Sequence, residues 1–110
     1  MADEITAKEL AEKKDDFVLI DVREADEVAE DGKIEGAINM SLGQLIRKAR
    51  HGDLDELKGK TICTYCNSGY RGNIGAEELA KKGFKTRTIK GGYSAWKEAE
   101  NKKKDNNIKE

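Results

Sequence analysis

A cysteine and an arginine are separated by four residues in the segment Cys66-Asn-Ser-Gly-Tyr-Arg71. The cysteine directly follows a run of β-forming residues, Thr61-Ile-Cys-Thr-Tyr65, and the segment leads into a helical pattern that ends before Gly83. A loop between a strand and a helix can turn backbone N–H groups inward, at the positive end of the helix dipole. Together with Arg71, these donors favour the thiolate, which is the nucleophilic form of a cysteine.

We therefore expect this segment to be a catalytic loop that binds an anion. Cys66 is the candidate nucleophile, and the loop and its anion-binding groups are Asn67, Ser68, Gly69, Tyr70 and Arg71. Gly69 permits a backbone conformation that a side chain would disfavour. The alternative is an inert buried cysteine, which is the commonest fate of a free thiol. The position at a strand end, the glycine and the arginine together favour a reactive cysteine.

Two charged residues follow another apolar run, Phe17-Val-Leu-Ile20. They are Asp21 and Arg23, and we assign them a supporting role. If both strands are parallel, their carboxyl ends lie at the same edge of a sheet, so Asp21 and Arg23 are expected on the same edge as Cys66. They can orient the loop, close the turn as an ion pair, or do both.

A second cysteine makes a Cys-x-x-Cys motif, Cys63 to Cys66, which leaves a redox pair as an alternative. Residues three apart in a strand point to opposite faces, so a disulfide between them would require distortion, and core packing is favoured for Cys63. His51 is the only histidine. Structural zinc usually needs four Cys or His ligands, so we expect no metal. No cofactor is expected either.

The rest of the chain supplies the elements that would position this loop. Further strands are expected at 36–40 and 84–89, with a short first strand before Thr6. Helices are expected after Thr6 and after Ser41, both of which can cap a helix N-terminus, and over Tyr93 to Ala99. Because strands alternate with helices, the pattern predicts an α/β fold with a largely parallel sheet.

The composition indicates one densely charged domain. Of 110 residues, 36% are hydrophobic and 39% are charged, and the 21 Lys and Arg nearly balance the 22 Asp and Glu. This balance gives no reason to expect a nucleic acid or a membrane as partner. No apolar run approaches the ~20 residues of a membrane helix, and the start lacks a targeting pattern, so a cytoplasmic location is predicted. We expect one domain over residues 1–100 and a polar, disordered tail over 101–110.

The chain resembles the rhodanese family in an ordered set of segments that spans about four fifths of its length. These segments are Leu19-Ile-Asp-Val-Arg23, Gly32-Lys-Ile-Glu-Gly-Ala-Ile-Asn39, Cys66-Asn-Ser-Gly-Tyr-Arg71, Gly83-Phe84, and Gly91-Gly92 with Trp96. The resemblance implies a three-layer fold with a mostly parallel sheet of about five strands flanked by helices. Lys33 stands where the family often has histidine, and Gly72 where it often has a small hydroxyl residue, which removes one hydrogen bond.

The resemblance also implies a single-domain sulfurtransferase. Cys66 would attack the sulfane sulfur of thiosulfate, polysulfide or a persulfide and keep it as a persulfide, which a thiol or cyanide acceptor would remove. The partners would be a small-molecule or protein sulfur donor and a thiol acceptor. Three alternatives stay open: a cysteine-dependent phosphatase, a non-catalytic rhodanese-like binding module, and a thiol–disulfide oxidoreductase. The phosphatase is disfavoured because related phosphatase loops hold five residues between Cys and Arg.

Overall fold

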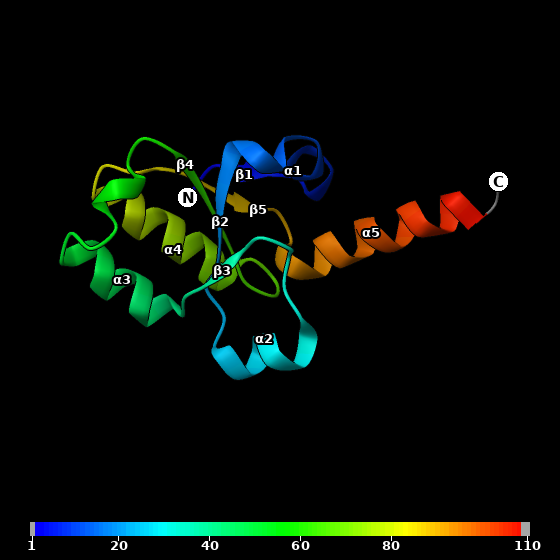
Figure 1. The fold of residues 1–110 in the computed structure, drawn as a ribbon, viewed down its shortest axis with the longest axis horizontal. Helices are drawn as coiled ribbons and strands as arrows, with labels where there is room; N and C mark the ends of the chain where they lie inside the picture. The colour runs from blue at the N-terminus through cyan, green and yellow to red at the C-terminus, as the bar shows by residue number, and fades with distance from the viewer. Residues whose placement is uncertain (1, 109–110) are drawn as a thin grey trace.

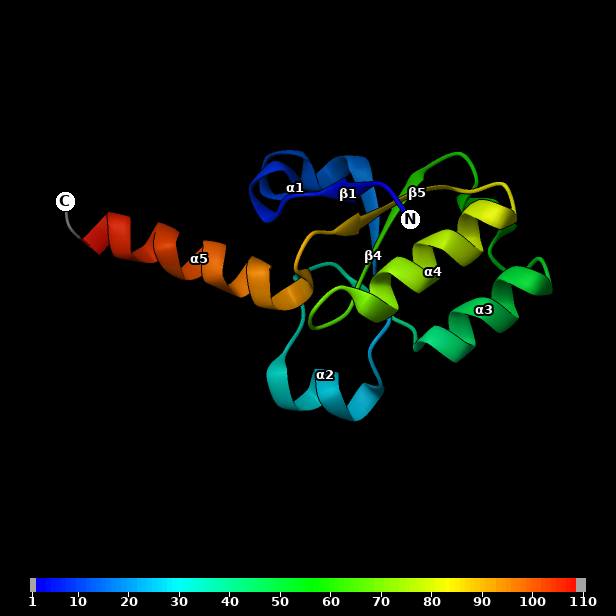
Figure 2. The ribbon, with the colours of Figure 1, turned by 180° about the vertical axis from the view of Figure 1, so that it is seen from behind.

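The computed structural model describes residues 2–108 and contains a five-stranded parallel sheet with helices on both faces (Figure 1, Figure 2). The strands are β1 (Glu4–Ile5), β2 (Phe17–Asp21), β3 (Ile38–Asn39), β4 (Thr61–Tyr65) and β5 (Lys85–Ile89). Their order across the sheet is β1-β5-β4-β2-β3, and each neighbouring pair is parallel. The predicted α/β fold is confirmed.

The two central strands bring the candidate site residues to one edge of the sheet. In the register of β2 and β4, Leu19 lies beside Cys63 and Asp21 beside Tyr65. Both strands therefore end at the same level. The residues that follow them, Val22 and Cys66, enter loops on the same edge, where an open α/β sheet binds its ligands.

The described residues form five α-helices: α1 (Ala7–Lys13), α2 (Ala25–Asp31), α3 (Leu42–Arg50), α4 (Tyr70–Lys81) and α5 (Gly92–Ile108). Two short 3-10 helices, η1 (Lys14–Asp16) and η2 (Asp55–Leu57), follow α1 and α3. The predicted caps are confirmed. The Thr6 hydroxyl accepts a hydrogen bond from the Glu9 N–H at 3.1 Å, and the Ser41 hydroxyl accepts one from the Gln44 N–H at 3.4 Å.

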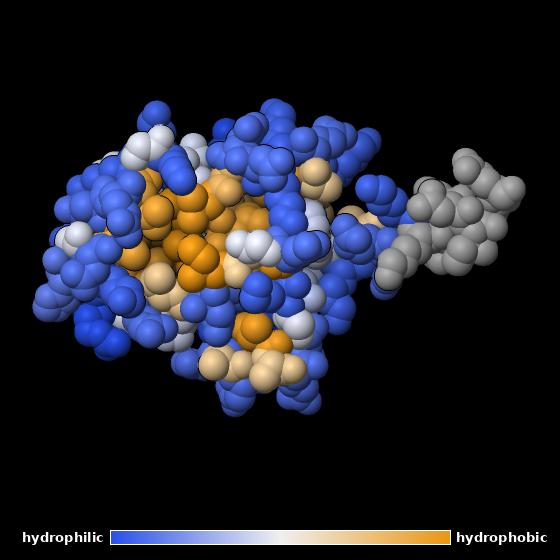
Figure 3. Space-filling model, in the orientation of Figure 1, coloured by the Kyte–Doolittle hydropathy of each residue, from blue (hydrophilic) through white to orange (hydrophobic). Residues whose placement is uncertain are grey.

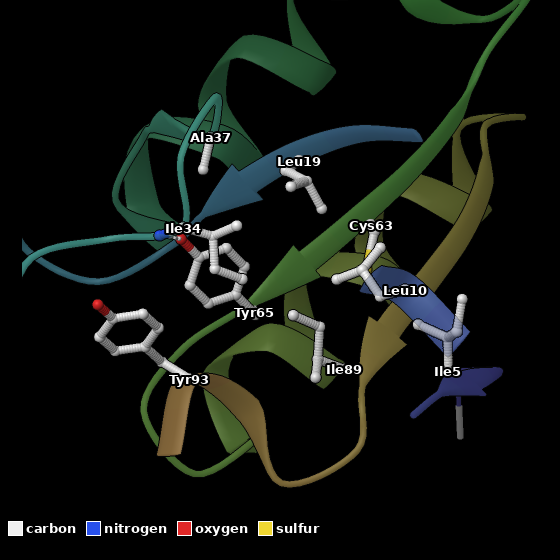
Figure 4. Packing of buried hydrophobic residues seen from close by; sticks show 9 residues of the cluster. All are labelled: Ile5, Leu10, Leu19, Ile34, Ala37, Cys63, Tyr65, Ile89 and Tyr93. Atoms are coloured by element: carbon white, nitrogen blue, oxygen red, sulfur yellow. Dashed lines mark hydrogen bonds between the residues drawn. The ribbon is translucent and has the colours of Figure 1, made fainter. Parts of the chain in front are cut away.

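The core has two parts. One cluster contains side chains of α1, β4 and α5, among them Leu10, Cys63 and Tyr93, and Figure 4 shows how they pack around the strands. The other contains Leu45 of α3 and Leu79 of α4, together with Cys66 from the loop after β4. This division places the two cysteines in separate clusters, as expected for residues three apart around a strand.

Helix α2 was not predicted from the sequence. None of its residues is buried, so the segment has no apolar periodicity that would reveal a helix. It begins instead with a cap, in which the Glu27 carboxylate accepts a hydrogen bond from the Glu24 N–H at 2.8 Å. This helix lies beyond the carboxyl end of β2 (Figure 1).

Helix α5 is longer than predicted. It was expected to end at Ala99, but it continues to Ile108 and leads away from the sheet, covering most of the predicted tail (Figure 1). The sequence between Tyr93 and Ile108 has no Gly or Pro to end a helix, and Lys102 pairs with Glu98 one turn earlier at 3.8 Å. The last two residues of the expected tail, 109 and 110, lie outside the described residues.

The surface is mainly polar, as the composition suggests. In the orientation of Figure 3, hydrophobic side chains gather in the region of β2 and β4 beside α3, within a border of hydrophilic ones. Val18, Met40, Leu42 and Leu57 are partly buried and pack against the second core cluster. Within residues 2–108, no helix is both long and apolar enough to cross a membrane.

Candidate active site

Cys66 lies where the sequence predicted it, immediately after β4 and four residues before α4. Only 1% of its surface is exposed. Burial alone would disfavour a negative charge on sulfur. The Gly69 N–H donates a hydrogen bond to the Cys66 Sγ at 3.3 Å, and the amino end of the 12-residue α4 begins at the next residue. Both the N–H group and the helix end favour an anionic sulfur.

Gly69 is necessary for the shape of this loop. Its φ of 112° lies in the left-handed region that side chains disfavour, and it forms the N-cap of α4. This conformation turns the Gly69 N–H back toward the sulfur three residues earlier. The sequence predicted several inward N–H donors, and the structure shows this one in contact with Sγ.

The other side of the loop is attached to the start of α5. The Cys66 carbonyl accepts a hydrogen bond from the Tyr93 N–H at 2.7 Å, and the Asn67 carbonyl accepts one from the Ser94 N–H at 3.1 Å. The C=O and N–H of a trans peptide point in opposite directions. The N–H groups of Asn67 and Ser68 are therefore directed away from α5.

Arg71 is held by a carboxylate that sequence reasoning did not identify. Its Nη1 donates to the Glu27 Oε2 at 2.6 Å and its Nη2 to the Glu27 Oε1 at 2.8 Å. The hydrogen bonds to Glu27 raise the pKa of Arg71, and the nearby Cys66 sulfur contributes in the same direction. Arg71 therefore lies between two groups that can carry negative charge, one of which is the candidate nucleophile.

The Glu27 carboxylate is the anionic half of this pair. The hydrogen bonds from Arg71, followed by that from the Glu24 N–H, lower the pKa of Glu27 to about 2. A depressed carboxyl pKa adds stability that is present above the normal glutamate pKa and is lost as the pH falls through about 2. The pair is thus fully charged near neutral pH.

Asp21 and Arg23 form a buried ion pair at the end of β2. The Arg23 Nη2 donates to the Asp21 Oδ2 at 2.6 Å and to the Gly32 carbonyl, also at 2.6 Å. The guanidinium also lies over the Tyr93 ring, 4.6 Å from its centroid. Of the two expected roles, these contacts match closing of the turn, because they fasten β2 to the end of α2, the helix that carries Glu27.

Gly72 stands where the family often has a small hydroxyl residue. It lacks that hydroxyl, but it allows α4 to lie close to β4. A Cβ at this position would lie 2.8 Å from the Tyr65 Cα, so only glycine lets α4 pack this close to β4. The Thr64 hydroxyl donates a hydrogen bond to the Gly72 carbonyl at 2.6 Å. The hydroxyl that anchors the first turn of α4 is therefore supplied by the strand.

Cys63 is a core residue, as predicted. It is fully buried in the cluster of Leu10, Leu19 and Ile89 (Figure 4), and burial raises the pKa of its thiol to about 12. Both cysteines are free. Within the described residues, no cluster of three or more His, Cys, Asp or Glu side chains could hold a metal ion.

We predict that Cys63→Ala retains most of the activity. The substitution removes one buried sulfur atom and should lower the free energy of unfolding by about 1 kcal/mol. Turnover and thermal unfolding of the purified variant measure the two effects. Loss of turnover with an unchanged melting curve would instead favour a redox pair of Cys63 and Cys66.

Comparison with known families gives a match over most of the chain. The model of the rhodanese-like domain matches residues 6–99. A Bacillus subtilis (strain 168) protein named "Putative sulfurtransferase YtwF" is 39% identical over 98 residues, which are 89% of this chain and 89% of that protein. The loop, Arg71 and the Asp21–Arg23 corner all lie inside the matched region.

Solved structures show the same fold. A rhodanese-related protein from Thermoplasma volcanium has a TM-score of 0.75 and 27% identity, covering 88% of this chain and 92% of its own. A Rhodopseudomonas palustris CGA009 protein described as a possible tyrosine phosphatase has a TM-score of 0.79 and 26% identity, covering 89% of this chain and 81% of its own.

Proposed function

Because the chain belongs to the rhodanese-like domain family, we propose that it transfers sulfane sulfur through a persulfide on Cys66. One observation carries this proposal. The Cys66 sulfur lies at the carboxyl end of β4, where it accepts a hydrogen bond from the Gly69 N–H at the start of α4. A thiolate held this way is prepared for nucleophilic attack.

The transfer divides into two displacements at sulfur. In the first, the Cys66 thiolate attacks the terminal sulfur of the donor, and the donor's S–S bond breaks with its electron pair. Thiosulfate would release sulfite, and a persulfide would release a thiolate. In the second, an acceptor thiolate or cyanide attacks the outer sulfur, and Cys66 leaves as a thiolate. No net oxidation occurs, so no separate oxidant or reductant is required.

The surroundings of the sulfur support both displacements. Negative charge lies on the Cys66 sulfur before the first displacement and after the second, and on the outer persulfide sulfur between them, so the Gly69 N–H stabilises the thiolate that attacks in the first step and leaves in the second. A hydrogen bond to a charged group contributes about 1.5–3 kcal/mol. The backbone N–H groups of Tyr93 and Ser94 also donate to carbonyls of the loop. The loop backbone is therefore already fixed and needs little reorganisation during the reaction.

Intact mass spectrometry tests the proposal. The protein is treated with a sulfane-sulfur donor, measured, and then treated with cyanide and measured again. We expect a gain of one sulfur atom on Cys66 that cyanide removes as thiocyanate. No gain with thiosulfate, polysulfide and a persulfide donor in turn would refute the proposal and favour a binding module.

A phosphatase is the second candidate, because one structurally similar protein is described as a possible tyrosine phosphatase. Only four residues lie between Cys66 and Arg71. A loop this short suits a single sulfur atom better than the three equatorial oxygens of a transferred phosphoryl group. We therefore expect no hydrolysis of an aryl phosphate under conditions in which sulfur transfer is measurable.

We predict that Arg71→Ala slows sulfur transfer and moves the alkylation of Cys66 by iodoacetamide to higher pH. The guanidinium is a positive charge beside the sulfur, and each pH unit of displacement corresponds to about 1.4 kcal/mol. Alkylation rates measured against pH give the displacement directly.

The double variant Arg71→Ala/Glu27→Gln controls for the unpaired carboxylate that Arg71→Ala leaves behind. Its pH curve should lie between those of the wild type and Arg71→Ala, because one of the two unfavourable charge changes is removed. Superimposable curves for wild type and Arg71→Ala, with equal turnover, would show that Arg71 only stabilises the fold.

A further inference from the structure

The active-site loop carries one cationic residue, and its charge is balanced by Glu27. Both terminal nitrogens of Arg71 donate to the two carboxylate oxygens of Glu27, and the side chains are 33% and 31% exposed. The Glu24 N–H donates to the same carboxylate, which fixes its position at the first turn of α2. The other loop residues after Cys66 are uncharged.

We propose that Glu27 is a positioning residue that sets donor specificity, favouring a persulfide of an organic thiol over thiosulfate. The inference rests on the proposed function of Cys66 and concerns which donor reaches it. Glu27 acts through Arg71, because it offsets the charge that a dianionic donor would need and directs the guanidinium toward α2.

The charges of the two donors differ at every stage. Thiosulfate brings two negative charges to a Cys66 thiolate and releases sulfite, which is also a dianion. An organic persulfide whose carbon skeleton has no net charge brings at most one net negative charge and releases a thiolate. Two opposite charges close together cancel at a distance, so the pair Arg71–Glu27 attracts an approaching dianion far less than Arg71 alone would.

An exposed aromatic side chain supplies the complementary part of the argument. Tyr70, between Gly69 and Arg71, is 76% exposed and is one of only two large hydrophobic side chains exposed among the residues described. Its ring offers an apolar contact to the carbon skeleton of an organic donor. Thiosulfate has no such skeleton, so Tyr70 adds nothing to its binding.

Steady-state kinetics with two donors test this proposal. Thiosulfate and cysteine persulfide, whose net charges near neutral pH are -2 and -1, are compared in the wild type, Glu27→Gln and Glu27→Asp. We expect the wild type to have the higher kcat/KM with the persulfide. Glu27→Gln should raise kcat/KM for thiosulfate about fivefold, mainly through a lower KM, as expected for release of one partly exposed charge. Glu27→Asp keeps the charge and should retain the wild-type preference.

Glu78→Gln is the matched control, because Glu78 forms an ion pair with Lys81 on the surface of α4 at 2.8 Å. This variant should leave kcat/KM unchanged for both donors. If Glu27→Gln altered kcat/KM for both donors by the same factor, Glu27 would only support the fold and the specificity proposal would fail alone. A wild type that prefers thiosulfate would also overturn it. If neither donor loaded Cys66, the proposed function itself would fail.

Discussion

Replacing Cys66 with serine is expected to abolish sulfur loading and turnover while the protein stays folded. A serine hydroxyl has no accessible anionic form near neutral pH and cannot form a persulfide, so the first displacement is lost completely. The Gly69 N–H can still donate to the serine oxygen, and the change in volume is small. The free energy of unfolding should therefore change by no more than about 1 kcal/mol.

Two measurements on the same sample decide this prediction. Intact mass after donor treatment should show no added sulfur in Cys66→Ser, and its thermal unfolding should stay close to that of the wild type. Cys63→Ala is the reciprocal control, because it keeps Cys66 and should load one sulfur. Wild-type turnover in Cys66→Ser would refute the persulfide mechanism, and loss of loading in both variants would point to a cysteine pair.

The central strands and the loop were predictable because their signals are local. The sequence predicted Thr61–Tyr65 as a strand, and β4 has these bounds. It also predicted a strand from Phe17 to Ile20, and β2 extends one residue further to Asp21. A parallel strand buried on both faces is continuously apolar, which is visible in a few residues of sequence. Because β4 ends at Tyr65, Cys66 directly follows it and lies at the edge of the sheet.

The elements that were missed depend on contacts distant in sequence. Glu27 reaches Arg71 across 44 positions, and it is one of many glutamates in the chain. One signal was available, because Glu24 and Glu27 have the spacing of a helix cap directly after a strand end. It would have placed a carboxylate at the same edge as Cys66. The strand predicted at 36–40 is too long, because its length depends on pairing with β2. Only Ile38 and Asn39 make that pairing.

The role of Gly91-Gly92 also became clear only from the tertiary structure. The two glycines precede most of α5, and both have positive φ values typical of a turn, 76° and 62°. Their second function is contact with the loop. Tyr93 and Ser94 can donate to the Cys66 and Asn67 carbonyls only if the start of α5 approaches those carbonyls closely.

We therefore predict that Gly92→Ala is strongly destabilising and impairs sulfur loading. A Cβ at Gly92 would overlap the Cys66 carbonyl oxygen and lie 2.8 Å from the Asn67 carbonyl oxygen, and the φ of 62° adds backbone strain. Because neither contact is with a flexible side chain, α5 or the loop must move. We expect the free energy of unfolding to fall by about 3 kcal/mol. Displacement of the Cys66 carbonyl would also shift the sulfur relative to the Gly69 N–H.

Gly36→Ala separates the two causes. Gly36 has a comparable φ of 87°, but a Cβ there would meet no atom within 4 Å, so its substitution adds backbone strain alone. This variant should lose about 1–2 kcal/mol and keep its sulfur loading. Urea unfolding and donor loading of both variants give the comparison. If Gly92→Ala and Gly36→Ala were equally stable and loaded sulfur equally well, the contact between α5 and the loop would not be what holds the Cys66 carbonyl in place.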